Sequence, residues 1–325
     1  MTSRTSFLLT GLLALLSWSL ADTAVWLRPP ATPQELTRTL QAAKRAGFTD
    51  VLLESFYHGR AVWTTDAAPP KLSYDALAVA APLARQLGLK LSAWLEVTYW
   101  RPAPEFGIPV TPLWQDRYAT LSREGQPSLA TSKLGFVDPA DPEVGAILER
   151  LVRDLATKYP EVGLHLDYLR YPREADFGYH PAAVADFTAR YGQDPRTLRP
   201  PQGDDPGDPL LAQWSTYRRD TVTALAKRLI GAYRGAGGSG PVTAAVYGGA
   251  DPLQRWQDWT GLQVAMPMFY FPANALYPLA LLGWPRGAGV WPGIRVGPGL
   301  PPLESQRATL SALGYPSVSV FGWTP

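Results

Sequence analysis

The chain has 325 residues, of which 46% are hydrophobic and 18% are charged, so it can bury a large core and is not a disordered chain. Its net charge of +2, with the basic residues scattered along the sequence, argues against nucleic-acid binding. The sequence has no cysteine, which excludes disulfides, thiolate chemistry and a lipid-anchored cysteine.

The first 21 residues have the pattern of a secretory signal peptide. Arg4 precedes an apolar run from residue 7 to residue 20, and Ser19-Leu20-Ala21 places small residues at a cleavage site. The run is shorter than the roughly 20 residues of a spanning helix, and no later segment is long and apolar enough to cross a membrane. We therefore expect residues 22–325 to form a mature protein that is secreted or lies in the periplasm or cell envelope.

After this segment, apolar strand-like runs alternate with amphipathic helical patterns, which is typical of βα units around a parallel sheet. Predicted strands cover residues 24–27, 50–56, 90–96, 242–247, 263–268, 289–294 and 317–321, and one more begins at residue 163. Predicted helices cover residues 32–46, 74–87, 141–158, 181–191, 210–234 and 303–313. A long loop over residues 98–136 and a Pro/Gly/Asp-rich insertion over residues 195–209 interrupt the rhythm, and a loop of that length is usually functional. No linker separates two domains, so we expect α/β architecture: a single-domain (β/α)8 TIM barrel over residues 22–325.

Polar side chains recur at the carboxyl ends of the first four predicted strands. Because strand side chains alternate between two faces, Glu54 shares a face with Leu52 and Phe56, while Asp167 shares one with His165. The same alternation points Arg28, Glu54, Glu96 and Asp167 inward, at the end of the barrel where such enzymes keep their active sites. The alternative is that these residues have no catalytic role, and that an Arg28–Glu54 ion pair only satisfies the polar groups at the mouth of the barrel.

Neighbouring carboxylates push their pKa values apart, so one can act as an acid while another acts as a base or nucleophile. We predict Asp167 and Glu96 as the catalytic pair, with Glu54 as the alternative partner. The later strand ends carry no carboxylate, so the acid and base should come from the second to fifth strands. The residues predicted to position or stack on sugar units are Arg28, Trp94, Trp100, His165, Tyr168, Arg170, Tyr171, Tyr247 and Tyr270.

Other catalytic classes have little support in the sequence. Only three histidines occur, and only His165 and Asp167 place two metal-ligand types on one strand face, so we expect no metal. The sequence contains no G-x-S-x-G, no Walker motif, and no G-x-G-x-x-G after the first strand. We therefore expect no cofactor.

Several segments together resemble the glycosyl-hydrolase-like 10 family of bacterial envelope barrels. They are the opening VWLRPP, the lead-in FVDPADPEV at residues 136–144, GLHLDYLRYP at residues 163–172, WSTYR at residues 214–218, Asp258-Trp259, and MPMFY at residues 266–270. The resemblance implies a TIM barrel acting on polysaccharide, with Asp167 central. Family members often carry a second acidic residue beside that aspartate, where this chain has Tyr168. The role of Glu96 is inferred from strand alternation alone.

These observations predict a secreted glycosidase that hydrolyses an envelope or extracellular polysaccharide or oligosaccharide. Two alternatives remain open at this stage. One is a glycan-binding or scaffold barrel that has lost catalysis. The other is a polysaccharide lyase or deacetylase on the same scaffold.

Overall fold

The structure, a computed structural model, describes residues 21–249 and 251–325. The predicted signal peptide lies almost entirely outside the described residues. Within those two ranges, no helix combines the length and the apolar character needed to cross a membrane.

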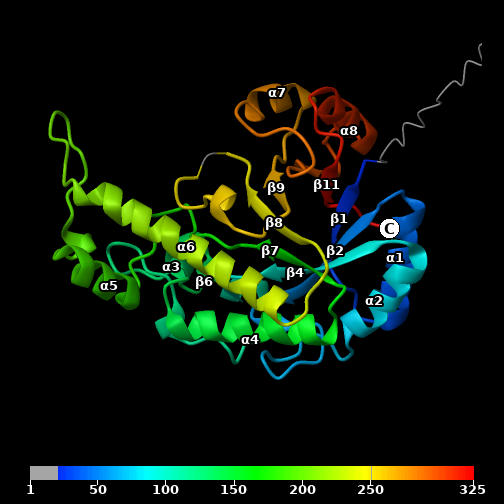
Figure 1. The fold of residues 1–325 in the computed structure, drawn as a ribbon, viewed down its shortest axis with the longest axis horizontal. Coiled ribbons are helices and arrows are strands. Elements are labelled where there is room, and N and C mark those ends of the chain that lie inside the picture. Colours follow the sequence, from blue (N-terminus) through cyan, green and yellow to red (C-terminus); the bar gives the residue numbers. More distant parts are fainter. Residues whose placement is uncertain (1–20, 250) are drawn as a thin grey trace, which may run out of the picture.

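Eight parallel strands close into a barrel (Figure 1), which confirms the predicted (β/α)8 fold. They are β1 Thr23–Leu27, β2 Asp50–Tyr57, β4 Lys90–Glu96, β7 Gly163–Asp167, β8 Val242–Tyr247, β9 Val264–Met268, β10 Gly293–Arg295 and β11 Val318–Phe321. Each strand pairs with the next, and β1 also pairs with β11, so the eight strands leave no open edge. A short strand, β3 (Arg60–Ala61), pairs antiparallel with the end of β2.

Full-length helices surround most of the barrel. They are α1 Pro33–Arg45, α2 Ala76–Leu87, α4 Pro142–Lys158, α6 Leu210–Gly235 and α8 Leu303–Ala312, and α4 lies along α6 (Figure 1). Their starts follow from local chemistry: Asp141 Oδ1 accepts hydrogen bonds from the backbone N–H groups of Glu143 and Val144, at 2.8 and 3.1 Å, and Pro142 occupies the first helical position.

Two connections leave this pattern. Between β4 and β7, the segment predicted as a long loop folds into its own antiparallel pair, β5 (Tyr99–Pro102) and β6 (Leu134–Phe136), with the short helices η1 Pro104–Phe106, η2 Asp116–Tyr118 and α3 Ser128–Ser132. Between β7 and α6, α5 (Pro181–Tyr191) and η3 (Pro195–Thr197) form an appended lobe.

The connections after β8 and β9 contain only short helices: η4 Trp256–Asp258 after β8, then η5 Asn274–Leu276 and α7 Tyr277–Ala280 after β9. The helical layer is therefore thin on this flank. The seventh barrel strand, predicted over residues 289–294, is observed as β10 and starts only at Gly293, with a single earlier bridge from Ala265 to Val290.

The apolar core has two layers that follow the strand alternation. Between sheet and helices lie residues such as Val25, Leu53 and Leu166, whereas Trp26, Leu52 and Trp94 fill the barrel interior. Phe56 belongs to the outer layer and not to the inner face shared by Leu52 and Glu54, so its predicted orientation is wrong. The β2–β4 register shifts between Glu54 and Phe56, and such an irregularity turns the following side chain to the other face.

Candidate active site

Three carboxylates lie together above the apolar barrel interior, at the carboxyl ends of the adjacent strands β2, β4 and β7. Glu96 and Asp167 are direct partners in the β4–β7 register, and Glu54 lies opposite Trp94 in the β2–β4 register. All three are buried: Glu54 is 0% exposed, Glu96 3% and Asp167 5%. The structure thus brings the predicted acids to one place.

Asp167 is held by three hydrogen-bond donors. Its Oδ1 accepts from the backbone N–H of Tyr168 at 2.6 Å and from the Arg170 guanidinium at 3.0 Å, and its Oδ2 accepts from Trp94 Nε1 at 3.1 Å. Each of these donors requires an acceptor oxygen, so the arrangement suits an ionised carboxylate. Tyr168 has a φ of +52°, an unusual conformation for a tyrosine.

Glu54 and Glu96 form a buried carboxyl pair, and the Oε2 atoms of both have no hydrogen-bond partner among the described residues. A proton shared between the two carboxyl groups would satisfy both oxygens. Burial raises the pKa of Glu54 to about 7, against the opposing effect of Arg28, whose Nε lies 3.3 Å from Glu54 Oε1. Burial, followed by the charges of Glu54 and Asp167, raises the pKa of Glu96 well above its usual range. The pair therefore holds one proton, and we assign it to Glu96 because burial and the charges of Glu54 and Asp167 all raise the pKa of Glu96.

A cavity of about 140 Å³ opens beside these groups. Its lining residues are Trp26, Arg28, Trp94, Glu96, Asp167, Tyr168, Arg170, Met268, Tyr270 and Phe321. Seven of these were predicted site residues. Sequence reasoning missed Trp26, Met268 and Phe321, although all three lie on predicted strands and their inward alternation could have indicated them.

The structure does not bring five predicted residues to the cavity wall. His165 is fully buried beneath Trp26: its Nε2 accepts from Trp26 Nε1 at 3.0 Å, so Nδ1 carries the proton and donates to Thr243 Oγ1 at 2.7 Å. Burial lowers the pKa of His165 to about 3, so the ring stays neutral. Trp100 and Tyr171 are likewise buried, and Glu54 lies behind Glu96.

Tyr247 lies next to the cavity without lining it. The Arg170 guanidinium stacks over the Tyr247 ring at 4.8 Å and over the Tyr168 ring at 4.3 Å. Among the described residues, no group of three or more His, Asp and Glu side chains has an arrangement that could hold a metal ion.

Comparisons with known proteins agree with this fold. A family model described as glycosyl hydrolase-like 10 matches residues 45–237, which include all three carboxylates. The PgaB (BpsB) glycoside hydrolase domain from Bordetella bronchiseptica aligns with a TM-score of 0.66 and 17% identity, covering 93% of each chain. The catalytic domain of β-amylase from Paenibacillus polymyxa gives a TM-score of 0.59 and 12% identity, covering 92% of this chain and 91% of that one.

A third solved structure, β-galactosidase from Bacillus circulans sp. alkalophilus, gives a TM-score of 0.60 and 10% identity, covering 92% of this chain and 50% of that one. At such identities the structures establish a shared fold. No curated protein sequence matches the chain. The family model spans more than half of the 325 residues, and the chain therefore belongs to the glycosyl hydrolase-like 10 family, as its motifs predicted.

Proposed function

We propose that this protein is a secreted glycoside hydrolase that cleaves an envelope or extracellular polysaccharide with Asp167 and Glu96. The observation that carries the proposal is their pairing in register on adjacent strands, beside one cavity, with Asp167 held by three hydrogen-bond donors and Glu96 buried beside a second carboxyl group. Glycoside hydrolysis needs such a pair: a protonated carboxyl that protonates the leaving oxygen and an ionised one on the other side of the sugar.

In this proposal Glu96 is the general acid and Asp167 is the nucleophile or base. Glu54 acts on Glu96, whose pKa is raised by burial and then by the charge of Glu54, so that Glu96 keeps its proton. Neighbouring strands lie roughly 4.8 Å apart, so two in-register acids are better suited to the roughly 5–5.5 Å of retaining enzymes than to the roughly 6.5–9.5 Å of inverting ones. We expect the product to keep the anomeric configuration of the substrate, which NMR of the first product formed would show.

The cavity volume limits what enters it. About 140 Å³ is below the roughly 300–1,000 Å³ typical of pockets for drug-sized ligands. Aromatic rings of Trp26, Trp94, Tyr270 and Phe321 form much of its wall, and flat rings of this kind pack against the apolar faces of sugars. The cavity is therefore suited to a single sugar ring.

Replacement of Asp167 by Asn tests the proposal. The variant keeps the size of the side chain and should lose about 10³-fold or more of the rate at which reducing ends appear. Asp186→Asn is the matched control, because Asp186 lies on α5 and pairs with Arg190 at 2.7 Å, away from the cavity. Full turnover in Asp167→Asn would rule out the assigned role.

A glycan-binding barrel without turnover is the second candidate. It is favoured by the three donors that hold Asp167, one of them in a buried ion pair with Arg170. Such a protein would bind oligosaccharide, and neither the unmodified protein nor Asp167→Asn would release reducing ends. Mass analysis of the products separates hydrolysis from a lyase, which leaves an unsaturated end, and from a deacetylase, which removes an acetyl group.

A further inference from the structure

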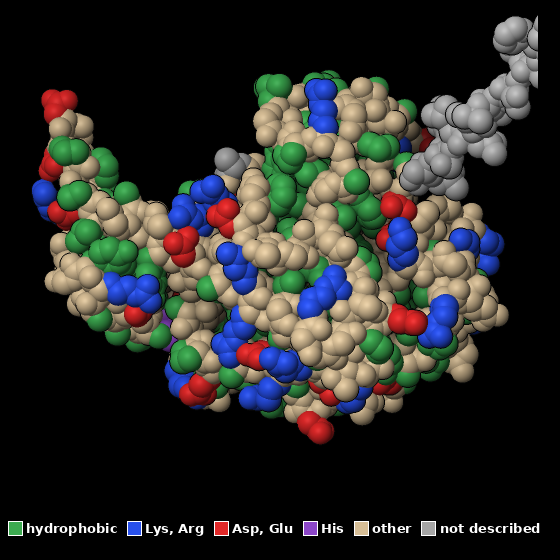
Figure 2. Space-filling model, viewed as in Figure 1, with side chains coloured by type: hydrophobic (Ala, Val, Ile, Leu, Met, Phe, Trp, Pro, Cys, Tyr) green, Lys and Arg blue, Asp and Glu red, His purple; other side chains and the backbone are tan. Residues whose placement is uncertain are grey.

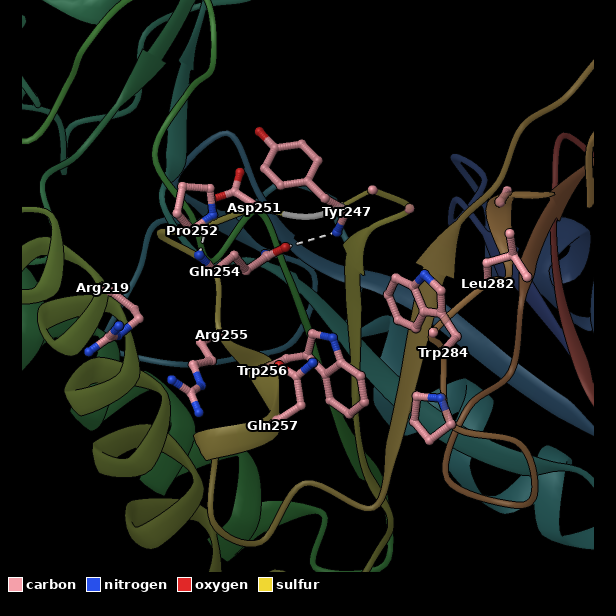
Figure 3. Close-up of a pocket in the computed structure, with 15 residues that line it drawn as sticks. Arg219, Tyr247, Asp251, Pro252, Gln254, Arg255, Trp256, Gln257, Leu282 and Trp284 are labelled. Atoms are coloured by element: carbon pink, nitrogen blue, oxygen red, sulfur yellow. Dashed lines mark hydrogen bonds between the residues drawn. The ribbon is translucent and has the colours of Figure 1, made fainter. Parts of the chain in front are cut away.

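A second cavity, of about 640 Å³, lies on the flank of the barrel where the helical layer is thin. The loop after β8 forms one wall with Arg219 of α6, and residues 280–285 of the connection after β9 form the other. Figure 3 shows these two walls facing each other. In Figure 2 hydrophobic side chains reach the surface below the segment that carries α7. The two connections without full-length helices thus leave an open cleft.

Two tryptophans dominate the cleft. Trp256 from the first wall and Trp284 from the second lie with their rings nearly parallel, at an interplanar angle of 10° and a centroid distance of 5.8 Å (Figure 3). The Phe269 ring packs edge-on against Trp284, with the two ring centroids 5.5 Å apart. Both tryptophans are only partly buried, and neither indole N–H has a hydrogen-bond acceptor among the described residues. The pair offers a flat apolar surface with two unused donors.

The charged groups around this surface are paired. Arg255 lies 3.1 Å from Asp258, Arg219 lies 3.1 Å from Asp220, and Asp251 accepts from Arg173 at 2.8 Å. The exposed amide of Gln257 adds further donors and an acceptor. A surface of flat rings, hydrogen-bonding groups and neutralised charges suits a neutral, hydroxyl-rich ligand better than an ionic one.

The cleft wall is fixed to the loop that follows Asp167. Gln254 Oε1 accepts from the Tyr247 backbone N–H at 2.8 Å (Figure 3), and its Nε2 donates to the Leu169 carbonyl at 3.1 Å. Tyr247 lines the cleft, and Arg170, which binds Asp167, stacks on its ring. The Arg170–Tyr247 contact therefore joins a residue that lines the cleft to one that lines the small cavity.

We propose that the cleft binds further sugar units of a polysaccharide substrate while the sugar at which the polysaccharide is cut occupies the small cavity. The substrate class is then a polymer of neutral pyranose units, and the protein prefers chains longer than the one ring that the cavity holds. This inference rests on the proposed function for the position of the cut, while binding in the cleft is tested separately.

The test is calorimetric titration of the Asp167→Asn protein, so that no probe is hydrolysed. The probes are neutral hexasaccharides of glucose, xylose, mannose and N-acetylglucosamine, the corresponding disaccharides, and hexagalacturonic acid as an acidic probe. At least one neutral hexasaccharide should bind more tightly than its disaccharide. Adding Trp256→Ala should weaken that binding by about 10-fold or more, equivalent to about 1.4 kcal/mol. Trp256→Phe, which keeps a flat ring, should retain most of it.

Trp114→Ala is the matched control, because Trp114 is also a partly buried tryptophan but lies on the connection between β4 and β7 and lines neither cavity. Gln257→Ala removes an exposed amide and should weaken hexasaccharide binding even if Trp256→Ala fails to fold. The inference is overturned if no neutral hexasaccharide binds, if only the acidic probe binds, or if Trp256→Ala and Gln257→Ala both bind as tightly as the parent. Hydrolysis by the unmodified protein is measured separately. The proposal that the cleft binds sugar can therefore fail while the catalytic proposal holds, and the catalytic proposal can fail while the cleft is found to bind sugar.

Discussion

At the scale of single residues, the buried carboxyl pair makes stability depend on pH. The folded-state pKa of Glu54 is raised to about 7 by burial, whereas its unfolded value is about 4.5. Between these values the folded state holds a proton that the unfolded state has released, so the unfolding free energy falls as pH rises through this range. Burial at this site thus stabilises the fold in acid and weakens it near neutrality.

We predict that the unfolding free energy decreases by up to about 3 kcal/mol between pH 4.5 and pH 7.5. Replacing Glu54 and Glu96 together by Gln should flatten this dependence, since glutamine does not titrate and the folded-state pKa values of both glutamates are raised, whereas Glu304→Gln, at an exposed position, should leave it unchanged. Urea denaturation at a series of pH values measures it. A slope that is the same with and without the two glutamates would show that the proton is held elsewhere.

His165 shows where residue-level reasoning stops. Alternation correctly turns its side chain inward with Asp167, but depth along the barrel axis decides whether an inward residue meets substrate. Trp26, from β1, covers His165 and hydrogen-bonds to it. That neighbour comes from 139 positions earlier in the chain, so a pattern local to one strand carries no sign of it.

At the scale of elements, one side chain joins α2 to its surroundings. Asp75 caps α2 by accepting from Ala78 N at 2.8 Å, and it also accepts from Thr64 N at 2.8 Å and from the Tyr159 hydroxyl at 2.9 Å. Tyr159 follows α4, so Asp75 ties the start of α2 to the end of α4. Thr32, by comparison, caps α1 through one longer bond of 3.3 Å to Glu35 N.

We therefore predict that Asp75→Ala lowers the unfolding free energy by about 2–3 kcal/mol, because one cap and two further hydrogen bonds are lost together. Thr32→Ala, which removes a cap and one exposed hydrogen bond to the Glu35 side chain, should cost about 0.5–1 kcal/mol. Chemical denaturation of both variants gives the comparison. Equal losses would mean that Asp75 acts only as a helix cap.

The elements themselves show what sequence could predict and why. Helix starts at Thr32 and Asp141 follow from caps within three residues, so they were predictable, as were the main strands from short apolar runs. β5 and β6 were not, because each has three or four residues and they pair with each other across the intervening segment. The turn of Phe56 away from Glu54 depends on a register shift against β4, which a single strand does not reveal. The cleft lies between two irregular connections whose sequence has no period.

At the scale of the whole molecule, the barrel carries a separate lobe with its own small core. Phe187 and Tyr179 pack against the fully buried Trp214 of α6, with ring centroids 5.0 Å apart in both cases. Beyond this lobe the chain extends as an arm, residues 199–208, at the far end of the molecule from α1 (Figure 1). Basic and acidic side chains are interspersed over the face seen in Figure 2, with no large patch of one sign.

The arm and the lobe core should respond to change in opposite ways. Arg199 and Asp208 close the base of the arm: Arg199 N donates to the Asp208 carboxylate at 2.7 Å, and Asp208 N donates to the Arg199 carbonyl at 2.9 Å. Replacing residues 200–207 by two glycines can therefore keep both ends in place, and we predict a change in unfolding free energy below about 1 kcal/mol. Trp214→Ala empties the lobe core and should cost about 3–5 kcal/mol. Denaturation of the two variants gives both changes in unfolding free energy. If the barrel depended on the arm, shortening the arm would lower the unfolding free energy by as much as Trp214→Ala does.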